Sequence, residues 1–279
     1  MTFEQPVITL ITGQAGAGKS TIAAFLSDEI DQSVFLSTSQ KLSENDLKKI
    51  DAMVIRGRSF ILDTDTLNLE TLTMISRALA RGYHLDTIVL HCEDIRIPLE
   101  RSRKHVNYLD ELNERNRSNL SFLPVALDRS KRILIIENST GTPRIEFKNN
   151  NEVVLSQNVK EESFIHRLSL RHNQHQSSKK IMQTIFERLK GSAKFRASLT
   201  AAKNVKSTVY NGLVIDRSED HILQQVSDVL YVLHDVALIK YQLAGEVIKG
   251  AVASISYANK DMGRDSSSAE RSNERDLSR

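Results

Sequence analysis

The sequence predicts an α/β fold: a parallel sheet with helices on both faces, followed by a helical connector and a small β-rich C-terminal domain. Three observations support this prediction. Short apolar runs alternate with helical patterns over the first 150 residues, a polar and basic segment follows, and short strand-like runs return after residue 207. Strands that alternate with helices favour a parallel sheet, because each crossover helix packs against a face of that sheet.

Apolar runs of strand length supply the expected parallel strands, which are Val7–Thr12, Ser33–Leu36, Phe60–Leu62, Leu85–Cys92 and Arg132–Glu137. Helical spacing separates several of them. The expected helices lie behind the first strand, where Ile22, Phe25 and Leu26 share one face, then over 69–79, within 99–112 and over 116–130. The helix over 69–79 ends at Arg81-Gly82, which is a typical helix stop.

Charge is concentrated in one segment of the chain. The formal net charge is +3, but residues 160–206 contain eleven Lys or Arg and only three Asp or Glu. Helical patterns are expected at Lys180–Leu189 and Phe195–Lys203. We favour a solvated pair of connecting helices over a contact with nucleic acid, because a run of charge is more often an exposed face.

These changes in composition divide the chain into a domain of residues 1–150, a basic, partly helical connector of 151–206, a small β-rich domain of 207–261 and a tail of 262–279. The expected strands of the β-rich domain are Val209–Ile215, Ile222–Gln225, Val229–His234 and Ala251–Tyr257. The tail is rich in Ser and charged residues, so we expect it to be disordered.

The totals exclude some classes of protein. No stretch approaches eighteen consecutive apolar residues, which argues against a membrane span. Glu4 and the strand that follows are unlike a signal peptide. Cys92 is the single cysteine, so it cannot form a disulfide framework, and we expect it to be a buried structural residue. Together these features predict a cytoplasmic protein.

A nucleotide-binding loop is the strongest functional signal. The sequence GQAGAGKS at Gly13–Ser20 is a full match to G-x-x-x-x-G-K-[ST], placed between an expected strand and an expected helix. In such a P-loop, glycines let backbone N–H groups face the phosphates, the Lys reaches the β- and γ-phosphates, and the Ser hydroxyl binds Mg²⁺. We therefore predict a P-loop NTPase-type sheet that binds a nucleotide together with Mg²⁺. The expected binding residues are Gly13, Gln14, Ala15, Gly16, Ala17, Gly18, Lys19, Ser20 and Thr21.

A second acidic site should complete the metal shell. The run Phe60-Ile-Leu-Asp63 has the form of a strand that ends in an aspartate near the magnesium, so Asp63 joins Ser20 as an expected metal ligand. Asp65 lies two residues further on, and a turn rich in Asp and Thr is the alternative reading of this stretch. Cations must also cover the transferring phosphoryl group, and Arg103 and Arg115 are the expected sources.

The ordered motifs resemble the zeta-toxin family of kinases. The resemblance covers about residues 5–147 and includes the P-loop, the strand ending at Asp63, Arg81-Gly-Tyr83, the Arg-rich stretch and Glu137-Asn-Ser-Thr-Gly141. It implies an enzyme, a phosphotransferase that uses ATP to phosphorylate a sugar hydroxyl. The acceptor it implies is a small hydroxyl-bearing molecule, usually UDP-N-acetylglucosamine.

Two departures from that family bear on catalysis. The family has an acidic catalytic residue just after its second strand, where this chain has Phe35-Leu-Ser-Thr-Ser39. Its Gly-Gly-His segment is reduced here to Arg103-Lys-His105-Val. Three readings stay open: Asp63 or Asp65 has taken the role of the base, the acceptor differs, or the site binds nucleotide with little transfer.

The last segment has a resemblance of its own. Val209-Tyr-Asn-Gly212, Gln224-Gln225, Leu233-His-Asp235 and Ser254-Ile-Ser-Tyr257 are similar to the small KfrB-type domain of conjugative-plasmid proteins, over about residues 207–260. This resemblance implies a plasmid or mobile-element setting. An antitoxin or a plasmid-system protein is the expected partner. The alternative function is therefore a catalytically weakened nucleotide-binding protein of a plasmid system, acting near DNA through the basic connector.

Overall fold

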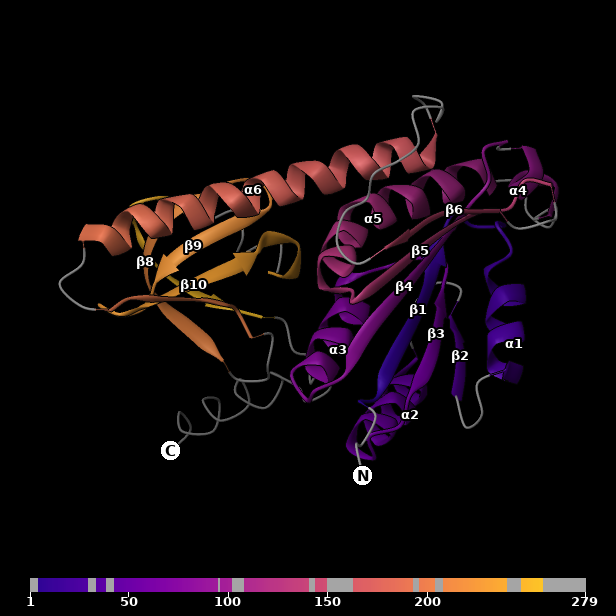
Figure 1. The fold of residues 1–279 in the computed structure, drawn as a ribbon, viewed down its shortest axis with the longest axis horizontal. Coiled ribbons are helices and arrows are strands. Elements are labelled where there is room, and N and C mark those ends of the chain that lie inside the picture. The colour runs from indigo at the N-terminus through magenta and orange to yellow at the C-terminus, as the bar shows by residue number, and fades with distance from the viewer. Residues whose placement is uncertain are drawn as a thin grey trace, which may run out of the picture.

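The computed structural model describes residues 5–29, 34–38, 43–94, 96–101, 108–140, 144–149, 163–192, 196–203, 208–239 and 247–257. They form two sheets connected by one long helix (Figure 1). The tail expected to be disordered, residues 262–279, lies outside the described residues.

The first sheet has six strands in the order β2-β3-β1-β4-β5-β6. Their bounds are β1 Val7–Gly13, β2 Val34–Thr38, β3 Phe60–Thr64, β4 His84–His91, β5 Arg132–Glu137 and β6 Arg144–Asn149. The first five strands pair in parallel, so the five predicted strands are confirmed. The edge strand β6, which was not among the predicted strands, pairs antiparallel to β5.

Helices cover both faces of this sheet (Figure 1). Along β1, Leu10 belongs to a cluster with the helices of one face, and its neighbour Ile11 belongs to a cluster with α1 on the other. This alternation is what a strand buried on both sides requires. The helices of the first face are α2 Glu44–Ile55, α3 Leu69–Leu79 and α5 Tyr108–Arg129, and those of the second are α1 Lys19–Glu29 and α4 Arg96–Arg101.

Local capping explains where two of these helices begin. The Ser43 side chain accepts a hydrogen bond from the backbone N–H of Asp46, and the Asp46 carboxylate accepts one from the N–H of Ser43, which together make a capping box at the start of α2. Asn68 caps α3 through the N–H of Thr71. The range 99–112, where one helix was expected, contains the end of α4 and the start of α5, and residues 102–107 lie outside the described part. The helix expected over 116–130 is the C-terminal part of the longer α5.

The connector differs from the prediction in two ways. The expected pair of helices is a single helix, α6 Phe164–Ser192, which packs against both α5 and the second sheet (Figure 1). The helix expected at Phe195–Lys203 is wrong, because Ser198–Ala201 is strand β7. Backbone hydrogen bonds of 2.8 Å from Ser198 N to Val229 O and from Ala202 N to Leu233 O hold it beside β10. Tertiary pairing thus overrides the local helical pattern.

The second sheet has the order β11-β8-β9-β10-β7. Its strands besides β7 are β8 Val209–Arg217, β9 His221–Gln225, β10 Leu230–Asp235 and β11 Val252–Ser256, and a 3₁₀ turn, η1 Val236–Leu238, follows β10. The four strands predicted for this part are therefore confirmed, with ends that differ by a few residues. β7 pairs in parallel with β10, and the other neighbours are antiparallel.

One hydrophobic core extends from the first sheet into the second. The same buried cluster contains Leu123 and Leu127 of α5, Leu168 of α6, Ile222 of β9 and Leu238 of η1. Because apolar side chains of both parts lose their contact with water together, separating the two parts would expose this cluster.

Ion pairs border this shared core. Lys179 of α6 lies 2.7 Å from the Asp128 carboxylate of α5, and Arg171 of α6 pairs with Asp220 of the second sheet. Burial raises the pKa of Asp128, but hydrogen bonds from Lys179 and Gln176 outweigh it and hold that pKa below its ordinary value. Two basic residues of the connector, Arg171 and Lys179, thus form ion pairs within the molecule. No helix in the described part of the chain is long and apolar enough to cross a membrane.

The close approach of β8 to β9 at Gly212 is open to a direct test. A Cβ at position 212 would overlap the carbonyl oxygen of Gln225, so Gly212→Ala should lower the free energy of unfolding by about 3 kcal/mol. Gly191→Ala is the matched control, since it adds the same methyl group to α6 where nothing lies within 4 Å. It should stabilise the protein by about 0.5 kcal/mol. Urea unfolding followed by circular dichroism measures both, and equal effects would contradict the close packing at Gly212.

Candidate functional site

The loop between β1 and α1 has the shape that its glycines allow. Gly13, Gly16 and Gly18 have φ values of 126°, 77° and 90°, in the range that favours glycine. A Cβ at Gly13 would overlap the carbonyl oxygen of Leu90 on β4, and one at Gly16 would lie 2.8 Å from the carbonyl oxygen of Pro98. The glycines are therefore required both by the turn and by the backbone packed against it.

Lys19 is folded inward over this loop. Its Nζ donates a hydrogen bond of 2.8 Å to the carbonyl oxygen of Gln14 and lies 2.8 Å from Oδ1 of Asp65. Only 3% of the residue is exposed. A buried ammonium needs such partners, because an unpaired charge away from water is costly.

Ser20 and Asp63 meet as the sequence predicts. The Ser20 hydroxyl donates a hydrogen bond of 2.7 Å to Oδ2 of Asp63, although the two residues are 43 positions apart. The strand order explains this contact: β3 lies directly beside β1, with Ile11 in register with Asp63. Because parallel strands end at the same edge of a sheet, the end of β3 faces the loop that follows β1.

Asp65 lies between two cations. Its Oδ1 faces Lys19, and its Oδ2 lies 3.0 Å from Nη1 of Arg115, which α5 presents to the site. The Asp65 side chain is partly exposed, whereas Asp63 is buried. The structure therefore brings five predicted residues together, which are Lys19, Ser20, Asp63, Asp65 and Arg115.

Asn119 is a part of the site that sequence analysis missed. It is fully buried on α5, and its Nδ2 donates hydrogen bonds of 3.0 Å to the carbonyl oxygens of Gly13 and Asp65. Its Oδ1 accepts a bond of 2.7 Å from the N–H of Leu67. One side chain thus ties the nucleotide loop to the segment after β3. Its spacing of four residues from Arg115 on one helix face was the available signal.

The far side of the loop has two further contacts. Asn138, within the predicted Glu137-Asn-Ser motif, donates a hydrogen bond of 2.8 Å to the carbonyl oxygen of Ala17. Arg101 donates weaker bonds to the carbonyl oxygens of Gly16 and Asn138, at 3.4 and 3.3 Å. Arg101 belongs to the predicted arginine-rich stretch but was not singled out, and the predicted Arg103 lies outside the described residues.

The remaining predicted loop residues are Gln14, Ala15, Ala17 and Thr21. Gln14 accepts a hydrogen bond of 2.9 Å on Oε1 from the N–H of Cys92, Ala15 and Ala17 are buried, and Thr21 is exposed on α1. Cys92 is buried, as expected, and burial raises the pKa of its thiol despite the nearby Arg101. A protonated thiol is a poor nucleophile, so Cys92 acts here as a packing residue.

The residues present fit ATP and Mg²⁺. The loop takes positive φ values at Gly13, Gly16 and Gly18, which glycine adopts without strain, and it ends at the N-terminus of α1, where the helix dipole favours anions. The Ser20 hydroxyl and the Asp63 carboxylate are oxygen ligands of the kind that Mg²⁺ prefers. Lys19 would supply the phosphate-binding ammonium.

The sheet and the loop together define a P-loop α/β protein. Residues 1–40 match the family described as Zeta toxin, and residues 209–265 match the KfrB Domain. The two resemblances seen in the sequence are thereby confirmed, at the nucleotide loop and at the C-terminal sheet. No curated protein matches the sequence.

Two solved structures show weak likeness. One belongs to the PezAT chromosomal toxin-antitoxin system of the human pathogen Streptococcus pneumoniae. It is 15% identical, with 61% of this chain and 86% of that chain covered and a TM-score of 0.35. The crystal structure of APE1195 is also 15% identical, with 42% and 77% covered and a TM-score of 0.27.

The link made by Asn119 can be tested by removing its side chain. Asn119→Ala leaves the N–H of Leu67 and two carbonyl oxygens without their buried partner, so the free energy of unfolding should fall by about 2 kcal/mol. Asn113→Ala is the matched control, since Asn113 is exposed on the same helix. Urea unfolding of the two variants checks this, and a loss below about 0.5 kcal/mol for Asn119→Ala would contradict its structural role.

Proposed function

We propose that the N-terminal domain is an ATP-dependent kinase of the zeta-toxin type, which transfers the γ-phosphoryl group to a hydroxyl of a small acceptor such as UDP-N-acetylglucosamine. The observation that carries this proposal is the convergence of Lys19, Ser20, Asp63, Asp65 and Arg115 at the carboxyl ends of β1 and β3. These are the groups that phosphoryl transfer needs, because its catalysis depends on positioning and on charge stabilisation.

The different burial of Asp63 and Asp65 suggests a different role for each carboxylate. Asp63 is buried and accepts the hydrogen bond of Ser20, so it belongs to the metal side of the site. Bound ATP with Mg²⁺ supplies the phosphoryl group and neutralises part of its charge. Ser20 and Asp63 would hold the metal, and Lys19, now paired with Asp65, would bind the phosphates.

Asp65 is the carboxylate available to an acceptor. It is more exposed than Asp63, and its Oδ1 loses a partner when Lys19 turns to the phosphates. A carboxylate in this place can orient an acceptor hydroxyl and take its proton. This assignment replaces the family's acidic residue after the second strand, since β2 reaches the level of Asp63 with Ser37 and ends at Thr38.

Arg115 then has two roles. It keeps Asp65 in place through the ion pair of 3.0 Å, and its guanidinium is close enough to the site to face the charge that develops on the transferring group. Arginine suits this task because its planar fork binds two oxygens at once.

The C-terminal domain suggests the kind of genetic system to which the kinase belongs. A KfrB Domain match at residues 209–265 supports a plasmid or conjugative system, and an antitoxin or another plasmid-system protein is the proposed partner. Contact with DNA stays the less favoured reading of the connector, because Arg171 and Lys179 are engaged by Asp220 and Asp128.

The kinase is tested by incubating the full chain with Mg²⁺-ATP and a panel of UDP-sugars and nucleotides, with products identified by mass spectrometry. We expect one phosphorylated sugar nucleotide. Lys19→Ala should weaken ATP binding at least about 100-fold. Asp65→Asn keeps the size of the side chain, so it should bind ATP as the natural protein does but transfer about 100-fold more slowly or less.

Asp63→Asn is the matched control for Asp65→Asn. It should raise the Mg²⁺ concentration needed for half-maximal activity about tenfold, an effect that Asp65→Asn should not share. ATP binding by the natural protein with no phosphorylated product from any acceptor would overturn the kinase and favour the alternative, a nucleotide-binding protein with little transfer.

A further inference from the structure

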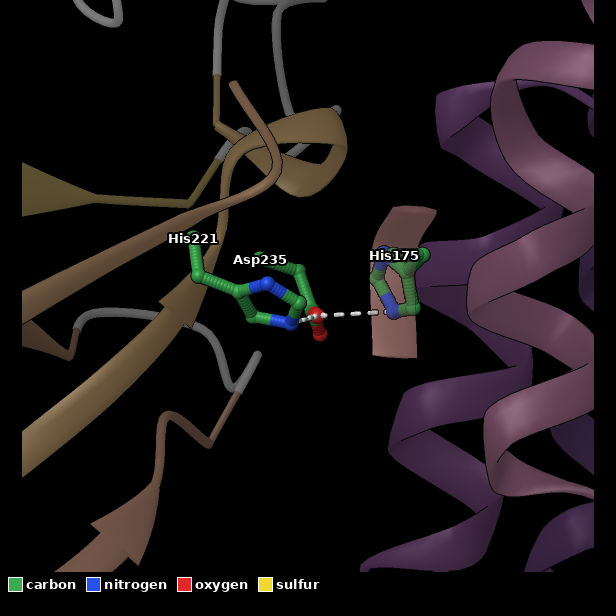
Figure 2. Close-up of side chains that lie close together, drawn as sticks. All are labelled: His175, His221 and Asp235. Atoms are coloured by element: carbon green, nitrogen blue, oxygen red, sulfur yellow. Dashed lines mark ion pairs between the residues drawn. The ribbon is translucent and has the colours of Figure 1, made fainter. Parts of the chain in front are cut away.

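A second group of ligand-type side chains lies far in sequence from the nucleotide loop, at the junction of α6 and the second sheet. His175 comes from α6, His221 begins β9 and Asp235 ends β10. Figure 2 shows the two imidazoles converging on one carboxylate. Nε2 of His221 lies 3.3 Å and Nε2 of His175 lies 3.9 Å from the same Oδ1 atom of Asp235.

All three side chains are shielded from water. The exposed fractions are 2% for His175, 1% for His221 and 17% for Asp235. The two imidazole rings pack against each other with their centroids 4.4 Å apart. Nε2 of His175 has no hydrogen-bond partner among the described residues, although it is buried and directed at the carboxylate. Such an orphaned polar atom requires an explanation.

Neighbouring groups orient the three ligand atoms. Nδ1 of His221 bonds the hydroxyl of Ser178 at 2.8 Å, so its Nε2 points toward Asp235. Nδ1 of His175 lies 4.0 Å from Oδ1 of Asp220. Arg129 binds Oδ2 of Asp235, which leaves Oδ1 to the two imidazoles. Outer partners of this kind fix the tautomer and the orientation of histidine ligands in metal sites.

These contacts leave Nε2 of His175 without a hydrogen-bond partner among the described residues. A carboxylate beside Nδ1 of His175 favours the tautomer with its proton on Nδ1, so its Nε2 offers a lone pair. Oδ1 of Asp235 is an acceptor as well. A cation between these atoms would satisfy them together. We propose that His175, His221 and Asp235 bind a divalent transition-metal ion of the zinc type.

The chemistry and the spacing both support zinc. Two imidazole nitrogens and one carboxylate oxygen are a common zinc donor set, whereas Mg²⁺ prefers oxygen alone. Bonds of about 2.0–2.1 Å in a tetrahedron place neighbouring ligand atoms about 3.4 Å apart. The observed 3.3 and 3.9 Å are close to this spacing, and the ligand atoms all lie within 4.8 Å of one another, so the side chains would move inward to bind the ion. The three protein ligands leave the fourth position to a water molecule.

The ion would fasten the C-terminal sheet to the rest of the molecule. Residues 209–265, which match the KfrB Domain, contain His221 and Asp235 but not His175. Arg129, which holds the carboxylate, belongs to α5 of the first domain. The site is therefore complete only when α6, α5 and the second sheet are packed together, so metal binding would stabilise that packing.

The test uses the full-length protein, freed of metal by a chelator and titrated with ZnCl₂, CoCl₂ or MgCl₂. We expect one tightly bound Zn²⁺ per chain, a visible absorption typical of four-coordinate Co²⁺, and no binding of Mg²⁺ that depends on the histidines. His175→Gln and His221→Gln should each weaken Zn²⁺ binding at least about 100-fold, and Ser178→Ala about tenfold, because it removes only an orienting bond.

His172→Gln is the matched control, since His172 is also buried on α6 but is not one of the three converging residues. It should change the affinity less than about threefold. If the ligand variants fail to fold, histidine ¹⁵N spectra of the natural protein decide the question: Zn²⁺ should shift Nε2 of two histidines and leave His172 unchanged. Absence of stoichiometric Zn²⁺ binding, or equal losses in His172→Gln and His175→Gln, would overturn the proposal.

Discussion

The position of β1 between β3 and β4 is the constraint on which the candidate site depends. Gly13 at the end of β1 packs so closely against the carbonyl oxygen of Leu90 that no side chain fits there. On the other side, β3 brings Asp63 to Ser20 and continues to Asp65 beside Lys19. If a different strand took the place of β3 beside β1, the loop would keep its sequence but lose its acidic partners.

The long helix α6 has a comparable role for the second half of the chain. Its buried face joins the core that α5 shares with the C-terminal sheet, and its basic side chains reach Asp128 and Asp220 across that boundary. A charged segment that looks solvated in the sequence is therefore partly an internal connection. Removing one partner of such a partly buried ion pair would leave the other charge without its partner, which is destabilising.

The site was predictable where its residues are adjacent in sequence or end a recognisable strand. The P-loop is eight consecutive residues, and the apolar run before Asp63 marks the strand that ends there. Lys19, Asp65 and Arg115 were each expected in the site, but the ion pairs that join Asp65 to both cations were not predicted. Asn119 and Arg101 were missed, because a helix residue reaches the loop only through the packing of α5 and α4 against the sheet.

Local chemistry in the sequence was enough to establish the nucleotide loop, the five parallel strands and the strands of the C-terminal sheet, since glycine turns and apolar periodicity act over a few residues. The packed molecule decided the rest. β7 is a strand because β10 offers it a partner, and α6 is one helix that spans two parts of the molecule. His175, His221 and Asp235 meet only there, because burial and long-range pairing depend on residues dozens of positions apart.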